Sequence, residues 1–309
     1  MYSAEKKDGN RGLKMRTALA GLSASVAVQL LGIPGAQAHD GFSTTYNHHI
    51  MPREFEIMMM TDYTSPADIK REEDGQGDYF SQMFEIEYAP SDQLAFEFMI
   101  EAFQDIETGD SEFTGFRWEA RYRLFKDDVF LNPMVYAEYE DLSVNTRYKM
   151  EVSGWRKAPY EEAVGAEASR ERILETRLVL SQDIGAHNVA FNWINESDLS
   201  SGTTAFGYSL GFLYRVSRDE AVEQPKGAAA MAHCLAGWSL IRPASLAFEL
   251  YGGLGDTRKF GLVPSRQEHY FQPTINFDVG ENQMLSFGLG IGLTETSDHM
   301  VRLNWGIML

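Results

Sequence analysis

The chain of 309 residues has a single cysteine, Cys234. One thiol excludes an internal disulfide framework, so the fold cannot depend on covalent cross-links. Basic residues are also few: 27 Lys and Arg stand against 45 Asp and Glu, which gives a formal net charge of −18 at pH 7. This deficit of positive charge argues against recognition of nucleic acid or anionic lipid surfaces through charge. We therefore expect no nucleic-acid partner.

Long apolar runs are lacking beyond the N-terminal region, so no transmembrane helix is predicted there. Residues 18–33 form a short apolar run that contains Gly and Ser, and small residues follow it up to Ala38. A basic start, a short apolar run and small residues at positions −3 and −1 of the cut predict a secretory signal peptide. We expect residues 1–38 to be removed by cleavage after Ala38, and residues 39–53 to form a flexible N-terminal segment.

Apolar and polar residues alternate through the last eleven residues, from His299 to Leu309. Val301 and Leu303 fall on one face of an extended chain, whereas Arg302 and Asn304 fall on the other. This period of two predicts a β-strand with one apolar face and one polar face.

The same alternation recurs along most of the chain. In residues 113–125, for example, Trp118 and Tyr122 alternate with Arg117 and Arg121, and only a strand separates the two sets. We predict about twelve strands, at residues 54–62, 84–88, 96–101, 113–125, 134–142, 171–183, 189–193, 206–215, 245–253, 270–279, 285–294 and 299–309.

The connections between these segments alternate between short and long. Tight turns at residues 89–92, 126–128, 183–186 and 280–283 alternate with longer polar links at 63–78, 105–112, 143–170, 196–203 and 255–268. The long segment 217–243 breaks this rule, because a short turn is expected there. A secreted β-sandwich is the alternative, but its strands are shorter and its outward face is polar.

The C-terminal alternation resembles the insertion signal of bacterial outer-membrane β-barrels, although this family usually ends in Phe and the chain ends in Leu309. The resemblance implies that residues 54–309 form an all-β, closed antiparallel transmembrane β-barrel of about twelve strands in the outer membrane of a Gram-negative bacterium. Its expected partners are membrane lipid and, through residues 299–309, the barrel-assembly machinery.

If the apolar faces meet lipid, the opposite faces line a lumen that is rich in carboxylates. The predicted lumen-lining residues are Glu85, Glu87, Glu97, Glu101, Arg117, Glu119, Arg121, Arg123, Glu138, Glu140, Glu175, Arg177 and Arg302. An acidic lumen predicts a passive pore for small polar or cationic solutes. The alternative is a non-conducting structural barrel plugged by cross-strand Arg–Glu networks. No cofactor is expected.

Histidines suggest two further kinds of site. Cleavage after Ala38 makes His39 the N-terminal residue, and its amine and imidazole, together with His48 and His49, are candidate metal ligands. The alternative is a mobile segment with incidental histidines. His269 and His299 fall near the rim of the predicted barrel beside serines and acids, which leaves a rim-site hydrolase as a minor alternative. We expect no catalytic residues and no enzyme.

Overall fold

The computed structural model describes residues 41–73, 75–146, 148–150, 152–155, 170–216, 241–280 and 282–309. The chain divides into two compact units, Met1–Ile33 and Pro34–Leu309, and all of the described residues belong to the second. The predicted signal peptide, His39, Cys234 and residues 217–240 lie outside the described residues.

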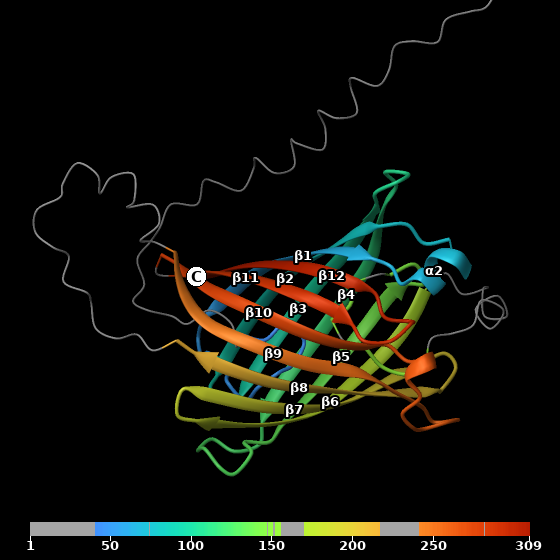
Figure 1. Cartoon of the computed structure of the whole chain (residues 1–309). Coiled ribbons are helices and arrows are strands. Elements are labelled where there is room, and N and C mark those ends of the chain that lie inside the picture. Colours follow the sequence, from blue (N-terminus) through green and yellow to red (C-terminus); the bar gives the residue numbers. More distant parts are fainter. Residues whose placement is uncertain are drawn as a thin grey trace, which may run out of the picture. The chain divides into compact units, whose positions relative to one another are not determined.

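Twelve β-strands are described, and they are joined in chain order into one closed barrel (Figure 1). They are β1 (Phe55–Ser65), β2 (Tyr79–Ser91), β3 (Leu94–Asp105), β4 (Ser111–Arg123), β5 (Met134–Ser143), β6 (Arg170–Ile184), β7 (His187–Asp198), β8 (Thr204–Arg215), β9 (Ile241–Asp256), β10 (His269–Val279), β11 (Gln283–Gly292) and β12 (His299–Met308). The short helix α2 (Asp68–Glu73) follows β1, and the 3-10 turn η2 (Pro264–Arg266) follows β9.

The barrel closes where its first and last strands pair. β1 and β12 are antiparallel, with a register that runs from Glu56 opposite Met308 to Ser65 opposite His299. Every other strand pairs with its neighbours in sequence, so none of the twelve described strands is an unpaired edge. The prediction of a closed antiparallel barrel of about twelve strands is confirmed.

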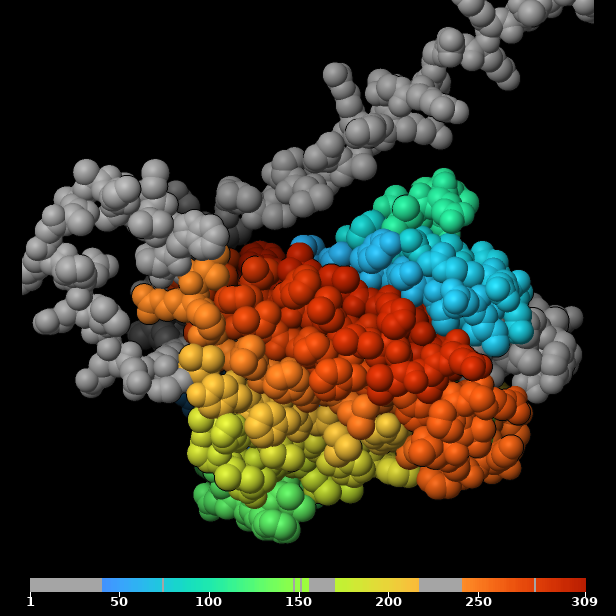
Figure 2. Space-filling view, in the orientation of Figure 1, coloured from blue at the N-terminus to red at the C-terminus, as the bar shows by residue number. Residues whose placement is uncertain are grey.

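The two faces of each strand separate as the alternation predicts. On β4 the Trp118 side chain is 56% exposed, whereas Arg117 is 2% exposed and faces inward. On β12 Leu303 is 45% exposed and Arg302 is 1% exposed. Other outward side chains are also apolar, among them Phe84, Phe96, Leu174, Leu178, Val189, Leu210, Phe212, Phe248, Leu250, Phe287, Leu289 and Ile291. In Figure 2 β9 to β12 form one continuous outer wall.

Strands of 10 to 16 residues with an apolar outward face have the length and the chemistry required to cross the hydrocarbon of a bilayer. The chain is thus an outer-membrane β-barrel, as predicted. Within the part of the chain that the structure describes, no helix has the length and apolar character needed to span a membrane.

The two ends of the barrel differ. At one end, which we call the short-turn end, β6 and β7 are joined by residues 185–186 and β10 and β11 by residues 280–282. At the other, the long-loop end, residues 66–78 and 257–268 form the connections. In outer-membrane barrels the short turns face the periplasm.

Candidate functional site

The lumen of the barrel is filled from the short-turn end by the residues that precede β1. We call residues 41–52 the plug. Phe42 and Thr45 are each 2% exposed and Asn47 is fully buried, although the sequence predicts a flexible segment here. That expectation is wrong for residues 41–53 because the backbone of the plug finds hydrogen-bond partners on strands far away in the sequence.

Glu249 on β9 binds three consecutive backbone amides of the plug. The N–H groups of Ser43 and Thr44 donate to its carboxylate at 2.8 Å, and that of Thr45 donates at 2.7 Å. Glu249 is 1% exposed, so these hydrogen bonds satisfy a buried charge that would otherwise be costly. The carboxylate therefore fixes the innermost turn of the plug.

Tyr46 anchors the plug to strands β4, β6 and β7. The guanidinium groups of Arg121 and Arg177 each lie 5.0 Å from the centroid of its ring. Its hydroxyl donates to Glu119 at 2.8 Å, and its backbone N–H and C=O bond to the Asn192 side chain at 2.7 and 2.8 Å. Cation–π contacts between buried groups are worth about 2 kcal/mol each, so Tyr46 is a principal anchor.

The inner wall lacks a side chain at one position where the plug packs against it. Gly211 on β8 faces inward, and a Cβ atom at this position would lie 2.6 Å from the ring of Phe42. No side chain fits there without displacing the ring. Gly211 therefore provides the space that seats Phe42.

A second segment enters the lumen from the long-loop end. We call it the inner loop; its described residues are 144–146, 148–150 and 152–155. Tyr148 and Met150 of this loop belong to the same buried cluster as Tyr46 and Ile50 of the plug. The cluster also contains the inward methionines Met58, Met60, Met83, Met99 and Met134, together with Ala89, Ala95, Tyr136 and Val179. Both segments thus bury apolar surface as well as polar groups.

Arg302 on β12 joins the two segments. Its guanidinium forms a bidentate pair with Asp62 on β1, at 2.8 and 2.6 Å. The same group donates to the Ser43 carbonyl of the plug at 3.2 Å and to the Lys149 carbonyl of the inner loop at 2.5 Å. One buried arginine therefore holds the plug, the inner loop and the wall together.

The inner loop is also fixed near the long-loop end by a cluster of charges. The Lys70 ammonium lies 2.6 Å from Glu268 and 2.9 Å from Asp298, and Lys149 pairs with the same two carboxylates. Burial opposes ionisation of Glu268, but the neighbouring ammonium groups of Lys149 and Lys70 outweigh burial and lower the pKa of Glu268. The Glu268 carboxyl group is therefore ionised at neutral pH.

The acidic and basic residues predicted to line the lumen lie mainly on the inner face of strands β2 to β6. Arg117 lies 3.1 Å from Glu138 and 3.5 Å from both Glu101 and Glu140. Arg121 lies 2.6 Å from Glu87 and 3.0 Å from Glu119 and also pairs with Glu97, while Arg177 pairs with Glu175. Glu85 is buried on β2, and Arg123 pairs with Asp128 at the short-turn end. Cross-strand Arg–Glu pairs therefore run through the lumen.

Among the described residues, cavities lie on either side of the filled region. One of about 310 Å³ opens beside the plug and is lined by His49, Glu54, Glu56, Glu87, Arg121 and Arg215, among others. The other, of about 240 Å³, is lined by Arg117, Glu140, Tyr148, Lys149, Glu196 and Glu268, among others. The plug and the inner loop occupy the lumen between them.

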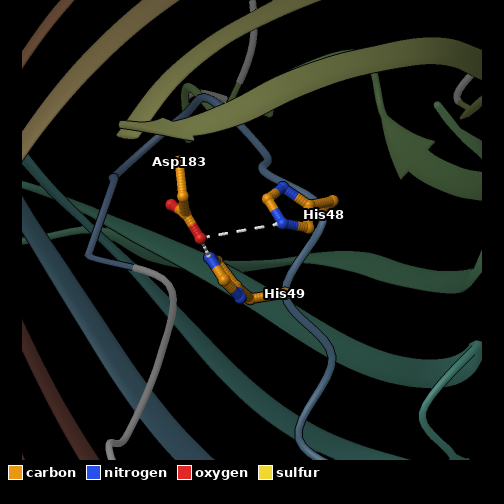
Figure 3. Close-up of side chains that lie close together, drawn as sticks. All are labelled: His48, His49 and Asp183. Carbon is orange, nitrogen blue, oxygen red and sulfur yellow. Dashed lines mark ion pairs between the residues drawn. The ribbon is translucent and has the colours of Figure 1, made fainter. Parts of the chain in front are cut away.

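Of the three predicted metal-binding histidines, the structure describes His48 and His49, and His39 lies outside the described residues. Both described histidines face Asp183, the last acidic residue of β6 (Figure 3). His48 is 2% exposed, and burial together with the neighbouring His49 lowers the pKa of His48 to about 4. Its imidazole is therefore neutral at physiological pH.

The rim histidines make no Ser–His pair among the described contacts. The Ser297 hydroxyl bonds to the backbone of His269, whose ring lies 3.2 Å from the Tyr208 hydroxyl. His299 accepts from the Gly292 amide. Residues 207–211 match the pattern Gly-x-Ser-x-Gly, but Ser209 lies within a strand, whereas the hydrolase nucleophile sits at a strand-to-helix turn.

Several residues of this site were not predicted from the sequence. They are the plug residues Ser43 to Tyr46, their partner Asn192, and the charge cluster of Lys70, Lys149 and Asp298. In the sequence, only Phe42 and Tyr46 indicate that this segment is ordered, because large aromatic residues are unusual in a disordered tail.

Comparisons with known proteins found no protein family that matches the chain and no curated protein that matches its sequence significantly. Among solved structures, the chain is similar to an outer-membrane channel from Pseudomonas putida F1, with 13% identity, coverage of 85% of this chain and 98% of that one, and a TM-score of 0.46. It is also similar to a loop-deletion mutant of OmpT, an outer-membrane protein of Vibrio cholerae, with 9% identity, 82% and 98% coverage and a TM-score of 0.33. A third is OmpF of Salmonella typhi, in complex with daunomycin, with 10% identity, 85% and 99% coverage and a TM-score of 0.28.

Proposed function

We propose that this barrel is an outer-membrane channel for small polar or cationic solutes, and that the plug closes it in the conformation described here. The observation that carries the proposal is the way the lumen is filled. The inner wall carries many charged and polar side chains beside its methionine cluster, and the plug that covers it is attached by hydrogen bonds to side chains such as Glu249 and Asn192 rather than by pairing within the sheet.

The attachment is reversible in principle. A buried hydrogen bond contributes about 1 kcal/mol net, and one to a charged group contributes about 1.5–3 kcal/mol. A few such bonds hold a segment in place, but leave a minor population in which it is released. Departure of the plug alone re-exposes the polar side chains of Glu119, Glu249 and Asn192 on the inner wall to water.

The charge of the lumen favours cations over anions. Carboxylates outnumber guanidinium groups among the inward residues, and the cavity next to the plug is lined by Glu54, Glu56 and Glu87. Rings of carboxylates select for cations in other pores. We propose no reaction for this protein, and we propose that the C-terminal strand is the part recognised by the barrel-assembly machinery.

Planar-bilayer conductance tests the proposal. The mature chain and a variant that lacks residues 41–50 are each refolded and checked for heat-modifiable gel mobility. We expect brief, rare openings for the mature chain and a steady cation-selective current for the deletion variant. A folded deletion variant that passes no current, or a mature chain with an equal steady current, would overturn the proposal that the plug closes the channel.

A further inference from the structure

Two adjacent histidines of the plug converge on one carboxylate of the barrel wall. The Nε2 atom of His49 lies 2.9 Å from Oδ2 of Asp183, and Nε2 of His48 lies 3.8 Å from the same oxygen. The two imidazole rings lie 4.3 Å apart. Figure 3 shows both rings pointing from the plug towards the end of β6.

These separations suit a small metal ion. Zinc bonds to imidazole nitrogen at about 2.0–2.1 Å and to carboxylate oxygen at about 2.0–2.2 Å, so two tetrahedral ligand atoms stand about 3.4 Å apart. The two observed distances lie on either side of this value. All three candidate ligand atoms lie within 4.8 Å of one another, so the site requires side-chain adjustments that bring them closer together.

Neighbouring hydrogen bonds already orient the three side chains. Nδ1 of His48 lies 2.5 Å from the Ser181 hydroxyl, so the ring presents Nε2 towards Asp183. Oδ1 of Asp183 accepts from the Asn188 side chain at 2.8 Å, which leaves Oδ2 towards the histidines. Hydrogen bonds of this kind fix the rotamer and tautomer of metal ligands.

The Arg215 guanidinium contacts two of these three side chains. Its guanidinium lies 3.1 Å from Oδ1 of Asp183 and 2.9 Å from Nε2 of His49. Its side chain is 28% exposed and, like His49, lines the 310 Å³ cavity, so it has room to move aside. The same cavity leaves space for water at the open coordination position.

We propose that His48, His49 and Asp183 form a site for Zn²⁺ that fastens the plug to the barrel wall, in competition with the Arg215 guanidinium. Two imidazoles and one carboxylate are a donor set that suits zinc, with water as the fourth ligand. The site requires only that the plug is seated, and so it does not depend on whether the barrel conducts.

Zinc binding to the folded mature chain in detergent, after removal of metal with a chelator, tests the site. Calorimetry is expected to give one strong Zn²⁺ site per chain, and Co²⁺ is expected to give the intense visible absorption of four-coordinate geometry. His48→Ala and His49→Ala each remove a ligand, so each should weaken binding by more than the roughly 10–100-fold that loss of a hydrogen-bond partner of a ligand costs. Arg215→Gln should tighten it about tenfold, because a competing positive charge is removed.

His299→Ala is the matched control, since this histidine is exposed at the other end of the barrel. It should leave the affinity unchanged. No binding, or binding that survives both His48→Ala and His49→Ala, would overturn the proposal. Loss of binding on His39→Ala alone would also overturn it, because the imidazole of residue 39 would then be an essential ligand.

Discussion

The link between Glu249 and the plug gives the sharpest prediction. Glu249→Gln keeps the length and shape of the side chain but removes its charge and replaces one acceptor oxygen with an NH₂ donor. In the native chain three backbone N–H groups, those of Ser43, Thr44 and Thr45, converge on the two carboxylate oxygens at 2.7–2.8 Å. The Gln side chain therefore accepts fewer of these hydrogen bonds, and its NH₂ group faces backbone N–H groups that are also donors.

The size of the effect follows from the hydrogen bonds lost. Bonds to a charged group contribute about 1.5–3 kcal/mol each, and neutral ones contribute about 1 kcal/mol. Conversion of three charged bonds into at most two neutral ones weakens plug docking by about 2–4 kcal/mol, after allowance for water that reaches the released groups. Since 1.4 kcal/mol corresponds to a factor of ten, the ratio of open to closed barrels should rise by about 30-fold to 1,000-fold.

Single-channel recording in a planar bilayer measures this ratio directly as the fraction of time spent open. Glu140→Gln is the matched control, because it removes the same charge from the same buried wall but contacts Arg117 at 3.5 Å. We expect Glu249→Gln to open frequently and Glu140→Gln to keep the open fraction of the native chain. Heat-modifiable mobility must show that both variants are folded.

The reasoning is refuted if folded Glu249→Gln opens no more often than the native chain. It is also refuted if Glu140→Gln opens to the same extent, because the current would then report the loss of lumen charge in general rather than release of the plug.

Three more predictions concern the plug, the inner loop and the outer wall. Gly211→Val should expel Phe42 from its seat, since a Cβ atom would lie 2.6 Å from the ring, and should raise conductance without loss of the folded form on gels. Glu268 has a lowered pKa, so its stabilising contribution is present above the ordinary value for a glutamate and is lost only as the pH falls through the lower, folded-state value. Trypsin cleavage of the inner loop, divided at each pH by the rate on an unstructured reference peptide, should therefore stay constant between pH 7.5 and 5.5 in the native chain and be faster in Glu268→Gln. A higher normalised rate for the native chain at pH 5.5 would contradict this. Trp118→Arg should lower the free energy of unfolding in lipid vesicles, measured by urea titration, by about 2–4 kcal/mol. Phe130→Arg, in the connection after β4, is the control and should have little effect. Equal effects of the two substitutions would argue against Trp118 facing lipid.

The barrel itself could be predicted from local sequence because its pattern is a consequence of covalent geometry. Successive side chains of a strand point to opposite faces, so Trp118 and Arg117 must separate whatever the rest of the chain does. Sequential hairpins then determine the neighbours of each strand, and the short connection between β10 and β11 limits their register. For the same reason the inward residues follow from the alternation of the sequence.

The residues that fill the lumen could not be predicted in this way. Ser43, Thr44 and Thr45 meet a carboxylate more than 200 positions away, and His48 meets a serine 133 positions away. Such contacts have no period and leave no local signal, since any polar segment looks flexible until its partners are known. The sequence of residues 39–53 therefore predicts a flexible tail, although residues 41–52 form the plug.

The sequence alone thus determined that the chain forms a β-barrel with an apolar outside and a charged inside, because alternation and strand geometry are local properties. Only the tertiary structure decided what fills that inside. Closure of the barrel brings Arg302, Asp62, the plug and the inner loop to one point. Buried polar groups must then find partners within the lumen, and the backbone of the plug and of the inner loop supplies them.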